Sequence, residues 1–504
     1  MSLKKNIFTN YVSQIYITLI GIVMVPMYVR YMGAESYGLV GFFAMLQAWF
    51  QLLDMGLTPT MARETARYNG GAIDAVSLRR LLRALEGIFI AIAVVGGGAM
   101  MAGATAIAGK WLKVQQLPID QVVHAIMLMA VIVALRWICG LYRSAITGFE
   151  QMVWLSGFSI AIATARFVLV IPFLIFISNS PVDFFTYQLI LAALEVMALW
   201  IKTYRLLPTV AGASRTPWDW QPLRKVLKFS LSIAFTSSVW VLVTQTDKLV
   251  LSKLLPLAEY AYFTLAVLVA SGVMVISGPI SGALLPRLTK LSAAGDEAGL
   301  IQLYRNATQF VAIIAVPVAL VLALFSEQVL WAWTGDSSVV AKAAPVLTLY
   351  ALGNGILALG AFPYYLQFAK GDVKLHMIGN ALFVTFLIPV LLLATWKYGV
   401  VGAGYAWLGA NTSYFLLWIP RVHRRFVKGL HSRWLLNDLG AIVSFSVLAT
   451  VILQWFLIWP HAREGVALML VVVATLVLAI AIISSSIGRE LLSNQLCKYI
   501  GKKN

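Results

Sequence analysis

The stretches YMGAESYGLV at residues 31–40 and LPLAEYAYFT at residues 255–264 carry the same Ala-Glu pair, about 224 positions apart. Other landmarks recur at this offset, with at most two positions of slack: Arg63 with Arg287, Thr65 with Thr289, Gly148 with Gly371, and Gly157 with Gly379. A fixed offset shared by several landmarks is typical of a duplicated architecture. We therefore expect two similar halves within the chain.

The composition indicates a membrane protein. Of 504 residues, 61% are hydrophobic and only 12% are charged, and the mean hydropathy is +0.86. A soluble domain needs more charge than this to form its surface. The net charge of +18 is the excess of basic residues that cytoplasmic loops carry under the positive-inside rule, so we do not infer nucleic-acid binding from it.

Long apolar runs recur along the whole chain and predict an all-α polytopic membrane protein of about 14 transmembrane helices, because ~20 apolar residues cross the hydrocarbon core. The predicted spans are roughly 9–31, 37–57, 84–109, 119–146, 155–178, 183–203, 229–250, 259–285, 307–330, 343–368, 376–396, 400–420, 438–459 and 465–487. The repeat groups the first twelve into two pseudo-symmetric six-helix lobes and leaves a C-terminal helix pair.

The predicted organisation has four parts. Residues 1–204 form the N-terminal lobe, 205–228 a cytoplasmic amphipathic linker, 229–428 the C-terminal lobe, and 429–504 the extra helix pair with a cytoplasmic tail. Lys and Arg gather in alternate loops, and this bias places both termini in the cytoplasm.

The sequence shows no enzyme or metal motif: no P-loop, no His pair on one helix face and no dinucleotide-binding glycine turn. Cys139 and Cys497 make neither a metal motif nor a disulfide framework. No outer loop is long enough to fold as a catalytic domain. We therefore expect a non-enzymatic protein that needs no cofactor and no metal.

Charged side chains inside the predicted spans are the candidate functional residues, because a charge in hydrocarbon is costly and usually faces a cavity or a partner. Arg136 lies within the fourth span with Arg143 on the same helix face, and Arg166 lies near the middle of the fifth. These arginines either line a cavity or pair with carboxylates to hold helices together, and Arg143 could also reach the cytoplasm. Lys248 and Arg30 lie toward the outer side.

Acidic and polar candidates lie on neighbouring spans. Glu195, in the middle of the sixth span, is either a proton carrier or a structural partner; Gln51 and Asp54 follow one stripe of the second span, and Asp247 precedes Lys248. The excess of cations predicts a positively charged cavity between the lobes. Arginine suits phosphate because its fork donates two parallel hydrogen bonds, so a polyprenyl pyrophosphate headgroup would fit this cavity.

Several segments resemble those of a known family: YMGAESYGL at 31–39, LDMGL at 53–57 followed by Arg63-Glu64, and TDKLVLS at 246–252 followed by Glu259-Tyr260. In this order they are similar to the Wzx-type O-antigen and lipid-linked oligosaccharide (polysaccharide) flippases, within the multidrug/oligosaccharidyl-lipid/polysaccharide (MOP) exporter superfamily. The resemblance covers essentially the whole chain.

The resemblance implies two lobes in a V shape, alternating access, a cationic lumen and, in several members, ion or proton coupling. The implied substrate is an undecaprenyl-pyrophosphate-linked oligosaccharide, moved from the inner to the outer leaflet of the bacterial cytoplasmic (inner) membrane. Membrane lipids are further expected partners, and a polysaccharide polymerase and a chain-length regulator could be others. One chain would suffice as a functional monomer. Arg63 and Arg287, at inner helix ends, either form a cytoplasmic gate or set topology and contact phospholipid.

Two other functions remain open. A cation-coupled drug exporter of the same superfamily usually has twelve spans and a lobe carboxylate, whereas the first span here contains no acid. A membrane glycosyltransferase or polymerase would generally need a sizeable outer loop.

Overall fold

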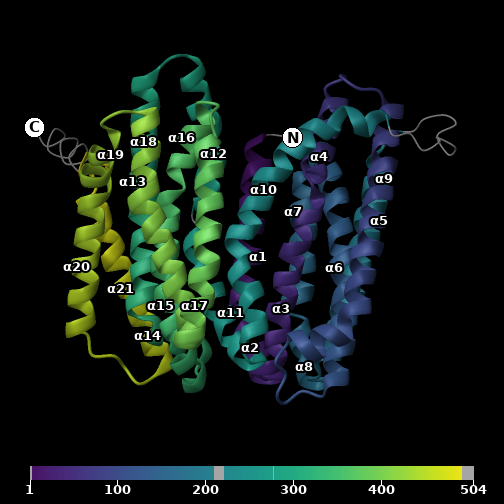
Figure 1. Cartoon of the computed structure of the whole chain (residues 1–504), viewed down its shortest axis with the longest axis horizontal. Coiled ribbons are helices and arrows are strands. Elements are labelled where there is room, and N and C mark those ends of the chain that lie inside the picture. The colour runs from purple at the N-terminus through teal and green to yellow at the C-terminus, as the bar shows by residue number, and fades with distance from the viewer. Residues whose placement is uncertain (1–2, 209–220, 276, 491–504) are drawn as a thin grey trace, which may run out of the picture. The chain divides into compact units, whose positions relative to one another are not determined.

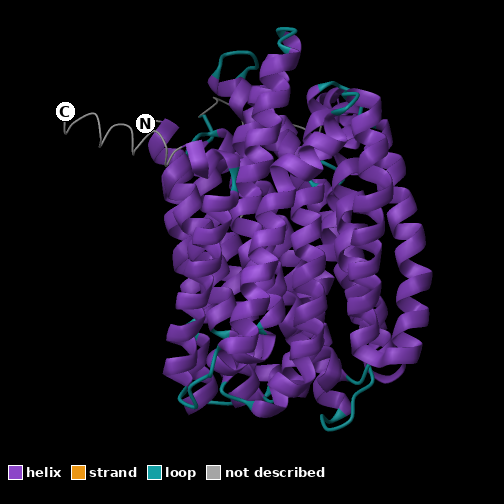
Figure 2. Cartoon of the chain, turned by 90° about the vertical axis from the view of Figure 1, so that its left-hand side faces the viewer, coloured by secondary structure: helices purple, strands orange, loops and turns teal. Residues whose placement is uncertain are grey.

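The computed structural model describes residues 3–208, 221–275 and 277–490. Within these ranges the chain consists of helices and short loops without a strand, apart from an isolated bridge between Lys113 and Pro256 (Figure 2). The chain divides into two compact units, Met1–Ala261 and Tyr262–Asn504. The central part of the predicted linker, residues 209–220, lies outside the described residues.

The first unit contains eleven α-helices and two short irregular helical turns in its described part. In chain order they are α1 Leu3–Val23, α2 Val25–Met32, α3 Ala34–Phe50, η1 Gln51–Asp54, α4 Leu57–Asn69, α5 Ala75–Ala106, η2 Ile107–Trp111, α6 Ile119–Gly148, α7 Met152–Phe167, α8 Val170–Phe176, α9 Pro181–Leu206, α10 Gln221–Leu254 and α11 Leu257–Val275, which continues into the second unit.

The second unit continues the helical pattern over its described residues. Its elements are α12 Ser277–Ala293, α13 Glu297–Leu324, α14 Ser326–Thr334, α15 Ser337–Gly360, α16 Phe362–Ala369, α17 Lys374–Ser413, η4 Tyr414–Trp418, α18 Ile419–Phe426, α19 Leu430–Arg433, η5 Trp434–Gly440, α20 Ala441–Phe456 and α21 Arg463–Ser484 (Figure 1).

The predicted spans are confirmed as helices of suitable length. Twelve helical segments of the described chain are long and apolar enough to cross a membrane. One of them, Lys374–Phe426, has 53 residues, which at 1.5 Å per residue is far longer than the ~30 Å of hydrocarbon. Gly399 interrupts it with φ 58°, a backbone conformation that glycine adopts without strain. This segment therefore contains two predicted spans, the eleventh and the twelfth. Helix α10, which is not among the twelve segments, corresponds to the predicted seventh span. The described helices thus account for all fourteen predicted spans.

The sharp reversal near Gly399 depends on a second glycine. A Cβ at Gly402 would overlap the backbone carbonyl of Ala394 on the first arm of α17, so only a glycine fits here. The two arms of α17 can therefore approach closely, as small residues allow in membrane helix pairs.

Helix α6 forms the centre of the first unit. It packs against α4, α5 and α9, and α5, α6 and α9 run side by side in Figure 1. Met129 is fully buried on α6, and Trp137 stacks on Phe89 of α5 with ring centroids 4.1 Å apart. Helix α10 packs against α3, α4 and α5, so this unit includes the helix that the repeat assigns to the second lobe. The predicted lobe boundaries stay a prediction.

The second unit is organised around α13. Tyr304 and Trp434 are fully buried in its core, together with Phe362 and Ile419. Helices α20 and α21 cover α13 on another side, where Phe325 packs with Val473 and Val477. In contrast, Trp455 is 83% exposed at the end of α20, as expected of a side chain that faces lipid or its interface.

Candidate functional site in the first unit

Two matching contacts join α6 to α9. Arg136 Nη2 donates to Gln188 Oε1 at 2.8 Å, and Arg143 Nη2 donates to Glu195 Oε1 at 2.6 Å. Both pairs are 52 residues apart in sequence, and their members are seven residues apart on each helix. Seven residues are close to two helical turns, about 10 Å along the axis. Two polar contacts therefore connect the same faces of α6 and α9. The partner on α9 is the neutral amide Gln188 in one contact and the carboxylate Glu195 in the other.

A third arginine, Arg166 of α7, also contacts the carboxylate of Glu195. Arg166 Nη2 lies 2.8 Å from Glu195 Oε2, so one carboxylate bridges Arg143 and Arg166. Arg143 Nη1 also donates to Ser159 Oγ on α7 at 2.7 Å. Gln188 Nε2 donates to the carbonyl of Arg166 at 3.1 Å, beside the break between α7 and α8. These bonds fix the end of α7 against α6 and α9.

Arg136 differs from the other two arginines in its partners. It donates to two amides, Gln188 and Gln47 of α3 (3.2 Å from Nη1), and its guanidinium lies 5.1 Å from the ring centroid of Phe43. No carboxylate pairs with it among the described residues. Amides and an aromatic face hold a cation in place without neutralising it.

We call Arg136, Arg143, Arg166 and Glu195 the arginine cluster. Three guanidinium groups against one carboxylate leave a formal charge of +2. Glu195 is almost entirely buried, with 4% of its side chain exposed, whereas Arg143 and Arg166 keep 30% and 22%. The Nε atoms of Arg136 and Arg166 are buried without a hydrogen-bond partner. The cluster therefore retains cationic donors whose hydrogen bonds are not satisfied by the described residues.

The structure brings together some predicted residues and separates others from them. Arg143 and Arg166 pair with Glu195, as the structural-pairing alternative predicts, and Gln188 connects Arg136 to Arg166. Arg143 therefore does not only reach the cytoplasm, while a cavity-lining role for the three arginines stays a prediction. Arg30 is exposed at the end of α2, with its guanidinium 5.8 Å from the ring centroid of Tyr31. Its described contacts do not reach the cluster.

Lys248 and Asp247 lie on α10. The Lys248 ammonium donates to the Thr244 carbonyl at 2.8 Å and to Gln245 Oε1 at 3.1 Å. Asp247 is buried and accepts the Lys248 backbone N–H at 2.7 Å. The described contacts of both side chains thus include neighbours within their own helix, and a substrate role stays a prediction.

Of the remaining predicted residues, Gln51 and Asp54 lie at a helix end, whereas Arg63 and Arg287 lie within α4 and α12 and not at the helix ends where the sequence placed them. Asp54 accepts from the backbone N–H (3.1 Å) and the hydroxyl of Thr58 and so caps the start of α4, while Gln51 is exposed beside it. Arg63, on α4, lies 3.5 Å from Glu64. Arg287 is exposed on α12 in the other unit. Arg63 and Arg287 belong to different units, and each unit is described separately. A gate formed by both arginines therefore stays a prediction, as does the cavity between the lobes.

Sequence reasoning missed the role of Phe43 under Arg136, because an aromatic residue in an apolar helix carries no sign of the cation it will meet. It also missed the buried carboxylate of Glu35. Its oxygens accept the backbone N–H groups of residues 115–117 at 2.5, 2.8 and 2.9 Å. The Ala-Glu pair of the repeat therefore has a structural reason in this unit: it fixes the loop before α6.

The fold and this cluster define a multi-pass helical membrane protein with a charged network inside its helix bundle. The chain belongs to the polysaccharide biosynthesis protein family, whose sequence model matches residues 3–292. No curated protein matches the sequence.

Solved structures share the fold at low sequence identity. A lipid II flippase MurJ in an inward closed conformation superimposes with a TM-score of 0.73 at 14% identity, over 96% of this chain and 99% of that one. An inward-facing multidrug resistance MATE family transporter of the MOP superfamily gives 0.68 at 14% identity, over 82% and 96%. The MATE multidrug transporter DinF-BH gives 0.59 at 14% identity, over 84% and 95%. The predicted MOP superfamily fold is thus confirmed.

Proposed function

We propose that this protein is a Wzx-type flippase that moves an undecaprenyl-pyrophosphate-linked oligosaccharide, such as an O-antigen repeat unit, across the cytoplasmic membrane by alternating access. The observation that supports this proposal is the net charge of the arginine cluster. A pyrophosphate diester carries two negative charges, and the cluster carries a formal +2 with donors still unpaired. Guanidinium groups bind phosphate oxygens through two parallel hydrogen bonds, which a lysine ammonium does not provide.

The buried position of the cluster determines its selectivity. An anion that enters must lose water, and only a ligand that restores those hydrogen bonds can compensate for that loss. The lipid tail of the substrate can remain in the bilayer while the headgroup binds arginine. A cationic drug, by contrast, would meet a net positive charge here, which disfavours the drug-exporter alternative.

Glu195 is the proposed coupling group. Its carboxylate bridges Arg143 and Arg166, so an arriving pyrophosphate would compete with it for the same guanidinium groups. Protonation of Glu195 would release both arginines to the substrate. Substrate binding and proton binding would then be linked through one side chain, as reciprocal coupling requires.

The remaining features of the proposal follow the predicted topology. Both termini lie in the cytoplasm, one chain is the functional unit, and a polysaccharide polymerase with its chain-length regulator acts on the product at the outer leaflet. Arg63 and Arg287 act at the cytoplasmic entrance.

The test is complementation of a strain that lacks its own flippase. Arg136→Ala removes a cation held by two amides, and a charged hydrogen bond is worth about 1.5–3 kcal/mol. We expect export to fall about tenfold to a hundredfold, with the lipid-linked oligosaccharide accumulating on the cytoplasmic leaflet. Arg136→Lys should recover part of the export. The control is Arg205→Ala, at the exposed end of α9. Full export by both Arg136→Ala and Arg166→Ala, at normal protein levels, would refute the proposal.

A further inference from the structure

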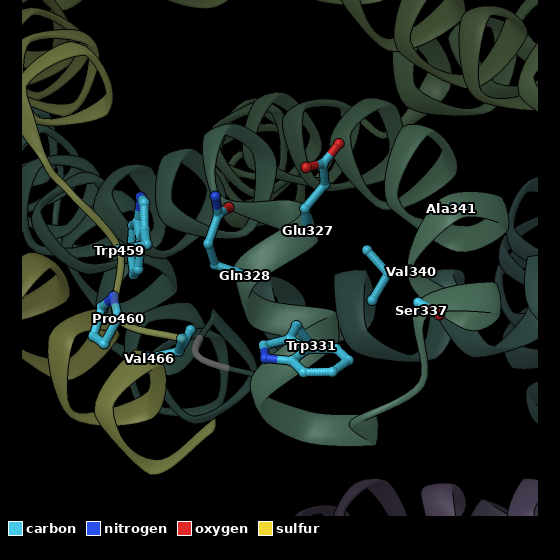
Figure 3. A pocket seen from close by; sticks show the side chains of 9 residues that line it. All are labelled: Glu327, Gln328, Trp331, Ser337, Val340, Ala341, Trp459, Pro460 and Val466. Carbon is cyan, nitrogen blue, oxygen red and sulfur yellow. The ribbon is translucent and has the colours of Figure 1, made fainter. Parts of the chain in front are cut away.

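The second unit contains a separate pocket of about 400 Å³, which is open to the surface rather than enclosed. It lies where α14, the start of α15 and the loop between α20 and α21 meet. In Figure 3 Glu327, Gln328 and Trp331 project from α14, between Trp459, Pro460 and Val466 on one side and Ser337, Val340 and Ala341 on the other. The volume is within the ~300–1,000 Å³ range of small-molecule sites.

The pocket is lined by two indole rings, of Trp331 and Trp459, and by the polar side chains of Glu327 and Gln328. Trp331 is half-buried, and its side chain has no aromatic or hydrogen-bonding partner among the described residues. Trp459 packs on the buried Phe325 with ring centroids 5.3 Å apart. Glu327 and Gln328 also have no side-chain partner in the described part of the chain. The pocket thus offers aromatic faces beside a free carboxylate and a free amide.

The walls of the pocket are held in place independently of any ligand. Arg463, at the start of α21, donates to the carbonyl of Ala332 at 2.8 Å and to that of Trp333. Asp336 caps α15 by accepting from the Ser338 N–H at 2.8 Å. A further hydrogen bond from the Ser338 hydroxyl lowers the pKa of the Asp336 carboxyl, so this cap is charged at neutral pH. A preformed pocket loses little conformational entropy when it binds.

These features match the chemistry of a sugar. The C–H edges of a pyranose ring carry partial positive charge and stack on the negative face of an indole. Its hydroxyl groups need both acceptors and donors, which Glu327 and Gln328 supply. We propose that this pocket binds neutral or N-acetylated saccharide units. The Glu327 carboxylate disfavours uronic acids by like-charge repulsion.

The proposal rests on the proposed function for its biological ligand, which would be the glycan end of the lipid-linked oligosaccharide. In the predicted topology the loops 331–342 and 457–465 lie on the outer side. The pocket would therefore meet the glycan after it has crossed the membrane. An alternative explanation is that the two tryptophans only anchor the protein at the membrane interface.

The experiment measures saccharide binding by saturation-transfer difference NMR, with the full chain in nanodiscs free of maltoside detergent. The probes are maltotetraose, chitotetraose and tetragalacturonate. We expect a signal from the two uncharged tetrasaccharides that falls at least fivefold in Trp331→Ala and recovers in part in Trp331→Phe. Glu327→Gln should raise the tetragalacturonate signal relative to the other two.

The control is Trp455→Ala, which removes an exposed indole from the end of α20 outside the pocket. Equal signals in wild-type and Trp331→Ala protein, or equal losses in Trp331→Ala and Trp455→Ala, would overturn the proposal in favour of an interfacial anchor. Arg136→Ala separates the two proposals: it should lower export about tenfold to a hundredfold, as above, and leave saccharide binding unchanged. Normal export by the arginine variants would refute the flippase and leave the binding result intact.

Discussion

Replacing Glu195 should destabilise the first unit, because this carboxylate separates cations that would otherwise repel one another. Glu195→Ala removes both ion pairs, at 2.6 and 2.8 Å. Breaking a fully buried pair costs about 3–5 kcal/mol. Arg143 and Arg166 keep 30% and 22% exposure, so water can solvate part of the released charge. We therefore expect a loss at the lower end, about 3 kcal/mol.

The neutral isostere allows a finer comparison. Glu195→Gln keeps one carbonyl oxygen for one arginine but turns an amide N–H₂ toward the other. One charged hydrogen bond is lost, so we expect a loss of about 1.5–3 kcal/mol. In the transport assay the same variant should weaken the dependence of export on the proton gradient. Export that varies with pH as in the wild-type protein would exclude Glu195 as the coupling group.

The assay is thermal unfolding of the purified protein in nanodiscs, with a surface pair as control. Glu297, 56% exposed, accepts from the Lys370 ammonium at 2.6 Å, and exposed pairs are worth only about 0–1 kcal/mol. Glu297→Gln should therefore leave the melting temperature nearly unchanged. In addition, Arg166→Ala should cost less in the Glu195→Ala background than alone, because it then removes an unpaired cation. Equal melting temperatures for Glu195→Ala and the wild type would refute the reasoning.

Other predictions concern packing and topology. Gly148→Ala places a Cβ 2.5 Å from the α4 backbone and should lower the free energy of unfolding by about 1–3 kcal/mol, as measured by thermal melting. Gly157→Ala, with no atom within 4 Å of the new Cβ, should leave the stability unchanged. Asp438→Ala should cost about 3–5 kcal/mol, since this buried carboxylate accepts two hydrogen bonds from one arginine; an unchanged melt would contradict this. Reporter fusions after Arg205 and Arg425 should be cytoplasmic, and a periplasmic signal at either would overturn the topology.

The segments that carry the family resemblance indicate the superfamily but not the glycan that is transported. Short segments near residues 31–64 and 246–260 indicated the MOP superfamily, and the match over residues 3–292 with the shared fold supports it. The glycan repeat unit is not encoded in those segments, because they fix loops and helix ends. Glu35 illustrates this, since its carboxylate binds backbone N–H groups rather than a ligand.

The sequence alone determined the helices, because crossing hydrocarbon demands about twenty apolar residues and leaves an unmistakable pattern. It also indicated Arg136, Arg166 and Glu195 as candidate functional residues, because a charged side chain within an apolar span is costly unless it faces a cavity or a partner. Helical spacing further predicted that Arg143 shares a face with Arg136.

Only the tertiary structure decided which faces meet. Spacing places a side chain on one side of its own helix but does not name the neighbour, and helices in lipid associate through packing detail rather than a hydrophobic pattern. Hence the sequence could not show that Glu195 bridges Arg143 and Arg166 while Arg136 has amide partners. For the same reason no sequence pattern marked the pocket that joins Trp331 to a loop more than a hundred residues further along the chain.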